Sequence, residues 1–215
     1  MMTKDILLAK SVVYRTEKEA IIKGVDLAVE TGDFLTLTGP SGGGKSTFLK
    51  LLASLLSPSD GKIYYKGTDL SELDPVAYRR EVSYAFQQPV LFGETVYDNL
   101  VFPFEVREVP VNQKRIREKL AQVYLDEAFL EKKISELSGG ERQRIALLRN
   151  ILFIPEVLLL DEVTVGLDEE SKKIVNQLIQ QVHHQGATII RVTHDSEELA
   201  QSAKIIQITG GKLDE

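Results

Sequence analysis

Short apolar runs alternate with segments of helical periodicity along most of the chain. Residues 34–38 combine alternation with β-branched positions, and residues 157–160 and 188–192 are apolar enough for strands of a sheet that is covered on both faces. Residues 82–86 and 204–208 predict two further strands. Strands that alternate with helices are typical of α/β proteins, so the pattern predicts an α/β fold with a parallel core.

One stretch departs from this alternation. Residues 112–130 and 139–153 both have helical periodicity with no strand between them. Pro103 and Pro110 precede the first of these segments and are interpreted as breaks in the chain's regular structure. The stretch is therefore predicted to be a helical insertion in the α/β core.

Composition limits the class of protein. The chain has 215 residues, of which 43% are hydrophobic, enough to bury one substantial core. Its formal net charge of −6 gives no electrostatic help to a nucleic-acid partner, and none is expected. The chain has no cysteine, which fits a reducing compartment such as the cytoplasm.

The hydrophobic runs are also short. The apolar run within residues 1–10 is too short for a signal peptide and is interpreted as a strand. The most apolar stretch, 145–160, is interrupted by polar residues and proline, so no run approaches the roughly 20 apolar residues that span a bilayer. A role at a membrane would therefore require a partner chain.

A glycine-rich segment follows the predicted strand 34–38. It fits the phosphate-loop pattern and leads into a helix, predicted from apolar residues at helical spacing between Phe48 and Leu56. Backbone N–H groups of such a loop converge on phosphate oxygens, while Lys45 reaches the outer phosphates and Ser46 offers a hydroxyl to Mg²⁺. The alternative is an ordinary glycine turn. The predicted nucleotide-binding residues are Gly39, Pro40, Ser41, Gly42, Gly43, Gly44, Lys45, Ser46 and Thr47.

Two carboxylates follow the apolar run 157–160. Asp161 stands where water-mediated coordination of Mg²⁺ is needed, and Glu162 can face a water that attacks the γ-phosphate. We therefore interpret Glu162 as the group that orients or deprotonates this water. The alternative is a solvated strand end, but the presence of Lys45 in the same chain favours the catalytic interpretation.

A second glycine-bearing helix start lies about ninety residues after the phosphate loop. Residues 137–141 read Leu-Ser-Gly-Gly-Glu, in which Ser138 and Glu141 form a capping box and Gly139 and Gly140 allow close backbone approach. An exposed helix N-terminus binds anions, although an ordinary helix cap is the alternative. The segment is too distant to belong to the first loop, which suggests that it approaches the phosphates from a second subunit.

The phosphate loop, Leu-Ser-Gly-Gly-Glu, Leu-Leu-Leu-Asp-Glu and Thr-His-Asp at 193–195, in this order, resemble the nucleotide-binding subunits of ABC transporters over nearly the whole chain. The resemblance implies a P-loop NTPase of ABC type, with a mixed sheet that has a parallel core flanked by helices, an antiparallel β subdomain and a helical subdomain. The whole chain 1–215 would be one nucleotide-binding domain. Residues 1–87 and 151–215 would form the ATPase core with the β subdomain, and residues 88–150 the helical subdomain.

The same resemblance implies roles for single residues. His194 matches the histidine that contacts the γ-phosphate, and with Glu162 and Gln87 it completes the predicted catalytic set. Gln87 matches the glutamine that meets Mg²⁺ and the attacking water, with its neighbour Gln88 as an alternative. The implied cofactors are ATP and Mg²⁺, with Ser46, Gln87 and Asp161 as metal ligands.

Other positions match contacts at the edge of the site. Tyr14 matches the aromatic residue that stacks on adenine, and Asp168 matches the aspartate of the loop that crosses between subunits. The segment Ser138 to Gly140 would bind the ATP held by the other subunit. Val165 and Gly166 depart from the family pattern in the crossing loop, through which the resemblance implies communication between the two ATP sites.

A more specific resemblance lies in residues 78–104 and 142–162, which are similar to the ATP-binding subunit of a bacterial iron exporter. It implies a homodimer with ATP between two copies and a separate integral membrane permease. The chain would then lie on the inner face of the membrane. Residues 87–97, with apolar side chains at 90–92, are the candidate permease surface, and a packed loop is the alternative.

Two other functions share these motifs. ABC-type ATPases of DNA repair or translation have the same site, but they usually carry long coiled coils, paired ATPase domains or basic surfaces, which this sequence lacks. A nucleotide switch that does not hydrolyse ATP is the second alternative, and the altered crossing loop favours it slightly. Measured phosphate release distinguishes a switch from an ATPase.

Overall fold

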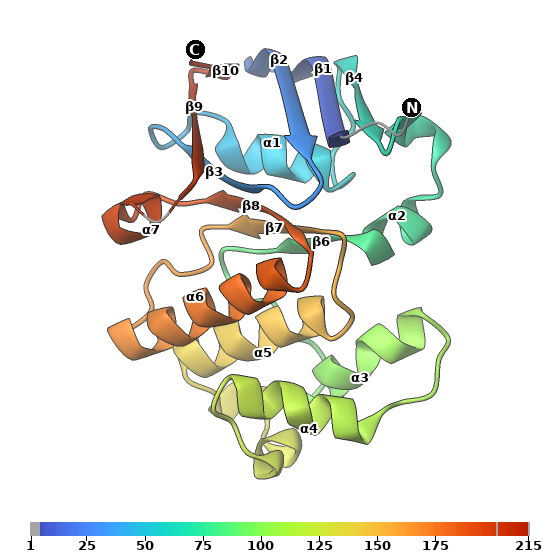
Figure 1. Ribbon diagram of the computed structural model, residues 1–215, viewed down its shortest axis with the longest axis vertical. Coiled ribbons are helices and arrows are strands. Elements are labelled where there is room, and N and C mark those ends of the chain that lie inside the picture. The colour runs from blue at the N-terminus through green and yellow to red at the C-terminus, as the bar shows by residue number, and fades with distance from the viewer. Residues whose placement is uncertain (1–4, 201, 215) are drawn as a thin grey trace. The chain divides into compact units, whose positions relative to one another are not determined.

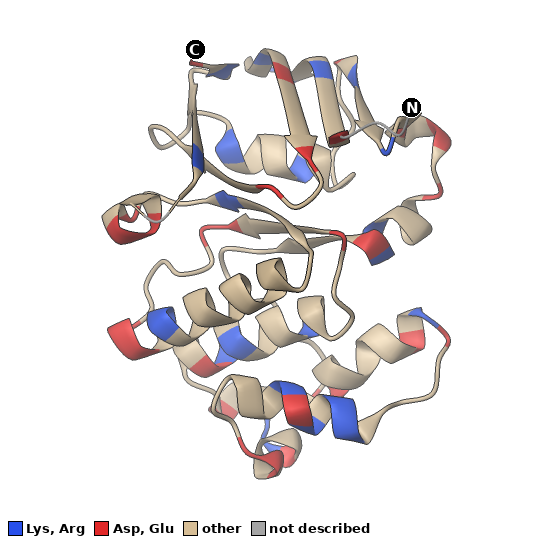
Figure 2. Ribbon diagram, viewed as in Figure 1, with Lys and Arg blue, Asp and Glu red and all other residues tan. Residues whose placement is uncertain are grey.

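The computed structural model describes residues 5–200 and 202–214 (Figure 1). Its contacts divide the chain into two compact units, each assembled from separate stretches of sequence. The first unit comprises Met1–Tyr84, Glu156–Glu162 and Ala187–Glu215, and the second comprises Ala85–Pro155 and Val163–Gly186. Acidic and basic residues are interspersed along the strands and helices of each unit (Figure 2).

A six-stranded mixed sheet contains the strands that lead to the phosphate loop and to the paired carboxylates. The order of its strands is β10-β9-β3-β8-β7-β6, in which β3 pairs in parallel with β8 and β9, and β7 pairs in parallel with β8. The short strand β10 is antiparallel to β9. The strands are β3 (Phe34–Thr38), β6 (Val82–Ala85), β7 (Val157–Asp161), β8 (Thr188–Val192), β9 (Lys204–Thr209) and β10 (Lys212–Leu213).

The five strands predicted for the α/β core, at 34–38, 82–86, 157–160, 188–192 and 204–208, are present within one residue of their expected limits. Every residue of β7 and of β8 is buried, as expected for parallel strands that are covered on both faces. The parallel pairing of β3, β7, β8 and β9 confirms the predicted α/β fold with a parallel core.

A second sheet in the first unit is antiparallel. Its order is β2-β1-β4-β5, built from β1 (Asp5–Arg15), β2 (Ala20–Glu30), β4 (Asp60–Tyr65) and β5 (Thr68–Asp69). The strand predicted over residues 1–10 thus runs from Asp5 to Arg15, while residues 1–4 lie outside the described part of the chain. The sheet supplies the antiparallel β portion that the family resemblance implied.

Helix α1 (Lys45–Leu52) starts directly after the glycine-rich loop but is shorter than the predicted stripe, which extended to Leu56. Ser54 adopts φ 54°, a left-handed conformation that ends the helix, and the Leu55 N–H donates to the Lys50 carbonyl at 2.9 Å. Leu55 is consequently 40% exposed. Periodicity could not detect this end because the terminating conformation occurs at a serine instead of a glycine.

Two short helices complete the first unit. Helix α2 (Pro75–Glu81) begins with proline in its first turn, and the side chain of Asp74 caps it by accepting N–H groups of Val76 and Ala77. Helix α7 (Ser196–Ala200) follows β8, and a 3₁₀ turn, η1 (Leu70–Glu72), precedes α2. The 3₁₀ turn η1 and helix α2 connect β5 to β6, whereas α7 connects β8 to β9 (Figure 1).

The second unit is helical. Its elements are α3 (Val96–Val106), α4 (Gln113–Gln122), α5 (Gly139–Ile151) and α6 (Glu169–His184), with 3₁₀ turns η2 (Glu127–Glu131) and η3 (Ile134–Glu136). Helices α4 and α5, which have no strand between them, confirm that a helical insertion interrupts the α/β core. Helix α6 ends at His184, before Gly186, which has φ 98°.

Two details of the predicted insertion are wrong. The helix expected over 112–130 ends at Gln122, because Tyr124 adopts φ 56° and the chain continues as the 3₁₀ turn η2. Pro103 was interpreted as a break but lies inside α3, whose start carries a Thr95–Asp98 capping box. A well-capped helix start and the burial of Val96, Leu100 and Phe104 outweigh the cost of one proline.

In the stretches 5–200 and 202–214, no helix combines the length and the apolar character needed to cross a membrane.

The core of the first unit can be tested with two leucines close together in sequence. Leu49 in α1 is 0% exposed, whereas Leu55, just beyond the helix, is 40% exposed. We expect Leu49→Ala to lower the free energy of unfolding by about 2 to 5 kcal/mol because it leaves a cavity in a packed core. Leu55→Ala should change it by less than about 0.5 kcal/mol. Urea unfolding followed by circular dichroism measures both, and equal effects would contradict this description of the core.

Candidate nucleotide-binding site

The glycine-rich loop between β3 and α1 is shaped by close backbone contacts. Gly39 has φ 126°, and a Cβ atom there would lie 2.2 Å from the Ile208 carbonyl oxygen of β9. Gly44 is the N-cap of α1 with φ 102°. Both conformations favour glycine. The glycines therefore allow the loop backbone to curve tightly before α1, whose N-terminal N–H groups can bind an anion.

Lys45 is the first residue of α1 and is 5% exposed. Its ammonium group donates to the carbonyl oxygens of Gly39 at 2.8 Å and of Pro40 at 2.9 Å. Burial lowers the pKa of Lys45, while the carboxylates of Glu162 and Asp161 oppose this shift. The loop thus holds a buried cation beside its own backbone, with two carboxylates close enough to act on it.

Asp161, at the end of β7, links the phosphate loop to β6. Its Oδ1 atom accepts a hydrogen bond from Ser46 Oγ at 2.8 Å, and its Oδ2 atom accepts one from the Tyr84 hydroxyl at 2.6 Å. The side chain is buried, and burial together with this bond to Asp161 raises the pKa of Tyr84. The structure therefore brings Ser46 and Asp161 together, although 115 residues separate them.

These oxygens fit Mg²⁺ chemically. Mg²⁺ prefers hard oxygen ligands and is usually bound by one or two protein groups together with water and substrate phosphates. The described residues contain no group of three or more His, Cys, Asp and Glu side chains that could hold a metal by themselves. The Ser46–Asp161 pair is consequently suited to a metal that arrives with a nucleotide.

Tyr84 is a contact that the sequence analysis missed. The alternation of side chains along β6 indicates that Tyr84 points inward and Ser83 outward. Alternation does not identify which group bonds to a buried hydroxyl. A buried tyrosine hydroxyl normally finds a hydrogen-bond partner, and here that partner is Asp161.

Glu162 follows β7 in a strained backbone conformation. Its φ is 49°, a left-handed value that is uncommon for residues other than glycine, and its N–H donates to the Val192 carbonyl at 3.2 Å. The Oε1 atom of Glu162 lies 3.3 Å from Nε2 of His194. The Glu162 side chain is 19% exposed and the His194 side chain 43%, so both remain accessible to a bound molecule. The pair combines a carboxylate and an imidazole that can exchange or orient a proton.

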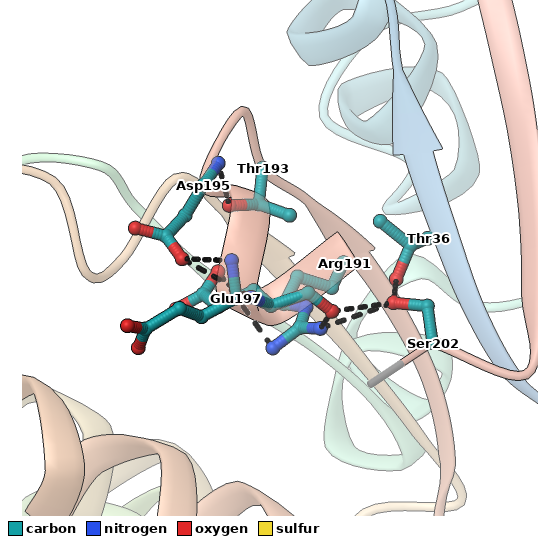
Figure 3. Close-up of polar contacts among 7 residues, drawn as sticks. Thr36, Arg191, Thr193, Asp195, Glu197 and Ser202 are labelled. Atoms are coloured by element: carbon teal, nitrogen blue, oxygen red, sulfur yellow. Dashed lines mark hydrogen bonds and ion pairs between the residues drawn. The ribbon is translucent and has the colours of Figure 1, made fainter. Parts of the chain in front are cut away.

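His194 occupies a turn after β8. The Asp195 N–H donates to Thr193 Oγ1 at 3.1 Å, as Figure 3 shows, and the Thr193 N–H donates to the Leu37 carbonyl of β3 at 3.3 Å. The turn is thus tied to the strand that leads into the phosphate loop. The structure brings Lys45, Ser46, Asp161, Glu162 and His194 together within the first unit.

The predicted second anion site lies in the second unit. Ser138 caps α5, because its Oγ accepts the Glu141 N–H at 3.2 Å and its own N–H donates to Glu141 Oε2 at 2.7 Å. This confirms the predicted capping box. Burial alone would raise the pKa of Glu141, but the Ser138 N–H and the Lys132 ammonium group outweigh burial and lower it. Ser138 and Gly139 are exposed, so the start of α5 is accessible.

Asp168 lies close to this helix start. It caps α6 by accepting the Ser171 N–H at 2.8 Å, and hydrogen bonds from Ser171 lower the pKa of Asp168. A Cβ atom on Gly140 would lie 2.2 Å from Ser171 Oγ and 3.5 Å from Asp168 Oδ2. The structure therefore places the predicted crossing-loop aspartate beside the Ser138 to Gly140 segment within one unit.

The remaining predicted residues occupy more separate positions. Tyr14 is in β1, half-buried against the core of the first unit. Gln87 and its alternative Gln88 follow β6 in the second unit, and both are exposed. Thr47 is half-buried in α1. In the altered crossing loop, Val165 is 56% exposed and Gly166 has φ 77°, a conformation that favours glycine.

Comparisons with known proteins agree with this geometry. A family model described as ABC transporter matches residues 22–165. The "Probable iron export ATP-binding protein FetA" of Escherichia coli is 44% identical over 204 residues, which are 94% of this chain and 91% of that protein. The "Spermidine/putrescine import ATP-binding protein PotA" of Hahella chejuensis is 36% identical over 99% of this chain but only 59% of that protein, so the chain spans less than two thirds of that relative.

A solved structure confirms the fold class. The ATP-binding cassette MJ0796, in a dimeric post-hydrolysis state bound to ADP and Pi, superimposes with a TM-score of 0.87 at 28% sequence identity. The match covers 97% of this chain and 97% of that chain. The predicted P-loop NTPase fold of ABC type is therefore confirmed.

The close approach at Gly140 yields a matched pair of glycine variants. A Cβ at Gly140 meets Ser171, whereas a Cβ at Gly139 has nothing within 4 Å. We expect Gly140→Ala to lower the free energy of unfolding by about 1 to 3 kcal/mol, because the new methyl group forces Ser171 or the helix to move. Gly139→Ala should be neutral or stabilise by up to about 1 kcal/mol, because alanine favours a helix. Chemical denaturation of both variants measures the difference, and an equal loss in both would contradict the packing at Gly140.

Proposed function

This chain belongs to the ABC transporter family, and on that premise we propose that it energises a separate membrane permease by ATP-driven closure of two copies. It is an ATP-binding subunit and an ATPase of that family. The observation that carries the proposal is the arrangement of Lys45, Asp161, Glu162 and His194 around the phosphate loop of the first unit.

The roles proposed for these residues follow from their chemistry. Lys45 and the N–H groups of the loop bind phosphate oxygens, and Lys45 can exchange its carbonyl partners for a phosphate because both are hydrogen-bond acceptors. Glu162 orients or deprotonates the attacking water, and His194 contacts the γ-phosphate and keeps Glu162 in place. Gln87 contacts Mg²⁺ and the attacking water, and Tyr14 stacks on adenine.

Mg²⁺ is proposed to bind with ATP at Ser46 and Asp161, with Gln87 as a further ligand. Bound Mg²⁺ neutralises charge on the phosphate oxygens. The Ser46 hydroxyl and the Asp161 carboxylate are hydrogen-bonded to each other at 2.8 Å, so both oxygens already face the same place. The Tyr84 hydroxyl fixes the other carboxylate oxygen of Asp161, which leaves Oδ1 for the metal side.

The second copy is proposed to contribute Ser138, Gly139, Gly140 and Asp168 to this ATP. Supporting this, Ser138 and Gly139 at the start of the 13-residue helix α5 are exposed, and the capping box there is formed by the side chains of Ser138 and Glu141. Asp168 lies beside the same segment. The solved relative MJ0796 is dimeric and bound to ADP and Pi, which supports a homodimer with nucleotide between its halves.

A membrane permease is proposed as the other partner. In the helical second unit, the candidate permease surface at 87–97 includes Val90, which is 58% exposed, and Phe92, which is 38% exposed. Phe92 packs edge-to-face against Phe102 of α3, also partly exposed, with ring centroids 4.8 Å apart. Exposed aromatic side chains supported by one another suit the binding of a permease helix. The chain would thus lie at the inner face of the membrane, held there by the permease.

The proposed division of the chain follows the family. Residues 1–87 and 151–215 would be the ATPase core with its β subdomain, and residues 88–150 the helical subdomain. Helices α3, α4 and α5 support this, since all three fall within or reach just past 88–150. The compact unit that contains them also includes α6.

Export of a metal ion, iron in particular, is the proposed transport process. The relative that supports it is named for iron export and is 44% identical over nearly the full length of both chains. The relatives named for spermidine and putrescine import are less similar, at 36% identity or below, and extend well beyond the matched region. Cargo would be bound by the permease, because the ATPase site is built to bind phosphate.

Glu162→Gln tests the shared site. We expect this variant to bind ATP and Mg²⁺, to elute as a dimer in size-exclusion chromatography, and to hydrolyse ATP about 10² to 10⁴ times more slowly, because it lacks the base for the attacking water. The additional substitution Lys45→Ala should abolish ATP binding and return the protein to a monomer. A persistent monomer with ATP bound would overturn the shared site, and full turnover would overturn the role of Glu162.

Tyr84→Phe tests the metal site, since it removes only a hydroxyl. We expect the Mg²⁺ concentration for half-maximal ATP hydrolysis to rise about 10-fold, because Asp161 loses the bond that orients it. Binding of a fluorescent ATP analogue without Mg²⁺ should be unchanged, and its enhancement by Mg²⁺ should need correspondingly more metal. If Mg²⁺ dependence is the same as in the unmodified protein, Tyr84 does not position Asp161.

A further inference from the structure

An arginine is the fourth residue of an otherwise uncharged, buried strand of five residues. Arg191 of β8 is 3% exposed, and β8 lies between the parallel strands β3 and β7, where Arg191 is in register with Thr36 and with Leu160. The guanidinium group lies 5.1 Å from the centre of the Phe34 ring. Burial lowers the pKa of Arg191, opposed by the carboxylates of Glu198 and Asp195. A buried charge in a sheet requires partners, and Arg191 finds Glu198 and Ser202 beyond the end of the strand.

These partners are in α7 and directly after it. Arg191 Nη2 donates to the Glu198 carbonyl at 2.8 Å and to Ser202 Oγ at 3.2 Å, and Nη1 lies 3.7 Å from the Glu198 carboxylate. Glu198 is 1% exposed, so the ion pair is fully buried. Ser202 Oγ also donates to the Glu198 carbonyl at 2.8 Å and lies 2.7 Å from Thr36 Oγ1. Figure 3 shows Ser202 between Arg191 and Thr36.

Helix α7 depends on these contacts because it is short. It has five residues, and helices of that length are not stable in water without tertiary contacts. Its start is fixed by Asp195, whose side chain accepts the N–H groups of Glu197 at 3.0 Å and of Glu198 at 3.1 Å. The Asp195 N–H in turn donates to Thr193 Oγ1. His194 lies between Thr193 and Asp195, so its place is set by β8 on one side and α7 on the other.

We propose that Arg191 and Glu198 are positioning residues that hold α7 against the sheet and thereby keep His194 beside Glu162. This inference rests on the proposed role of His194. Replacing a buried ion pair by apolar residues of similar size often leaves the free energy of unfolding unchanged. A gain in stability therefore does not explain why the Arg191–Glu198 pair is present. Its geometric effect is specific: the pair joins the two ends of the turn that carries His194.

The proposal predicts the effect of Glu198→Gln on turnover. We expect kcat for ATP hydrolysis to fall about 10-fold while KM for ATP changes less than about 2-fold, because a displaced catalytic group affects the chemical step more than binding. The matched control is Glu197→Gln, which makes the same change on an exposed residue of the same helix and should leave kcat unchanged. Arg191→Lys should retain more activity than Arg191→Met, because lysine keeps the charge.

A double-variant cycle separates positioning from a general structural effect. If Glu198 acts through His194, Glu198→Gln should cause no further loss of kcat in the His194→Ala background. An equal loss in both backgrounds would overturn the proposal. Full activity of His194→Ala itself would instead overturn the proposed function of His194, so the two failures are distinguishable.

Nuclear magnetic resonance provides a readout that does not depend on activity. The chain has three histidines, His183, His184 and His194, and the His194 ring signal is the one that disappears in His194→Ala. Glu198→Gln should shift or broaden the His194 signal and leave the other two unchanged. An unchanged His194 signal would overturn the proposal. If Glu198→Gln does not fold, Ser202→Ala removes one hydroxyl from the same network and should produce a smaller change in the same signal, and no change would again overturn it.

Discussion

The candidate site depends on one constraint: parallel strands in a buried sheet end at the same edge. Strands β3, β8 and β7 are adjacent and parallel, so their carboxyl ends bring the phosphate loop, the His194 turn and the Asp161–Glu162 pair together from distant parts of the sequence. Every residue of β7 and β8 is buried, and a shift in register would expose apolar surface to water. The hydrophobic core therefore holds the geometry of the phosphate site. The loops that form the site are fixed in place because each follows a buried strand of the same sheet.

Polar contacts then refine what the sheet brings together. Ser46, Asp161 and Tyr84 form a chain of hydrogen bonds across three elements, so the carboxylate has one preferred orientation. Glu162 is held in a left-handed conformation, with its N–H bonded to the Val192 carbonyl of the neighbouring strand. Fixed dipoles and charges of this kind stabilise developing charge without having to reorganise during a reaction. Local strain at Glu162 is consistent with a role in chemistry, because the surrounding sheet is what maintains it.

The second unit uses helix starts in place of strand ends. The capping box of α5 leaves Ser138 and Gly139 exposed while Gly140 packs closely on Ser171, and Ser171 is bonded to the aspartate that caps α6. Two helix N-termini thus share one small contact region, and the Asp168 carboxylate already bonds to the start of α6. This arrangement joins the Ser138 to Gly140 segment to Asp168 through Ser171.

The sequence by itself determined five strands of the six-stranded sheet, the phosphate loop and the α5 capping box, because each rests on local periodicity or on motifs of a few adjacent residues. It did not determine where α1 and α4 end, since a serine and a tyrosine adopt left-handed conformations that are typical of glycine. The Tyr84–Asp161 bond and the Arg191–Glu198 pair were decided only by the tertiary structure. Both join residues whose partner is selected by burial: a hydroxyl or a guanidinium group removed from water must bond to whatever polar atom the fold brings within reach.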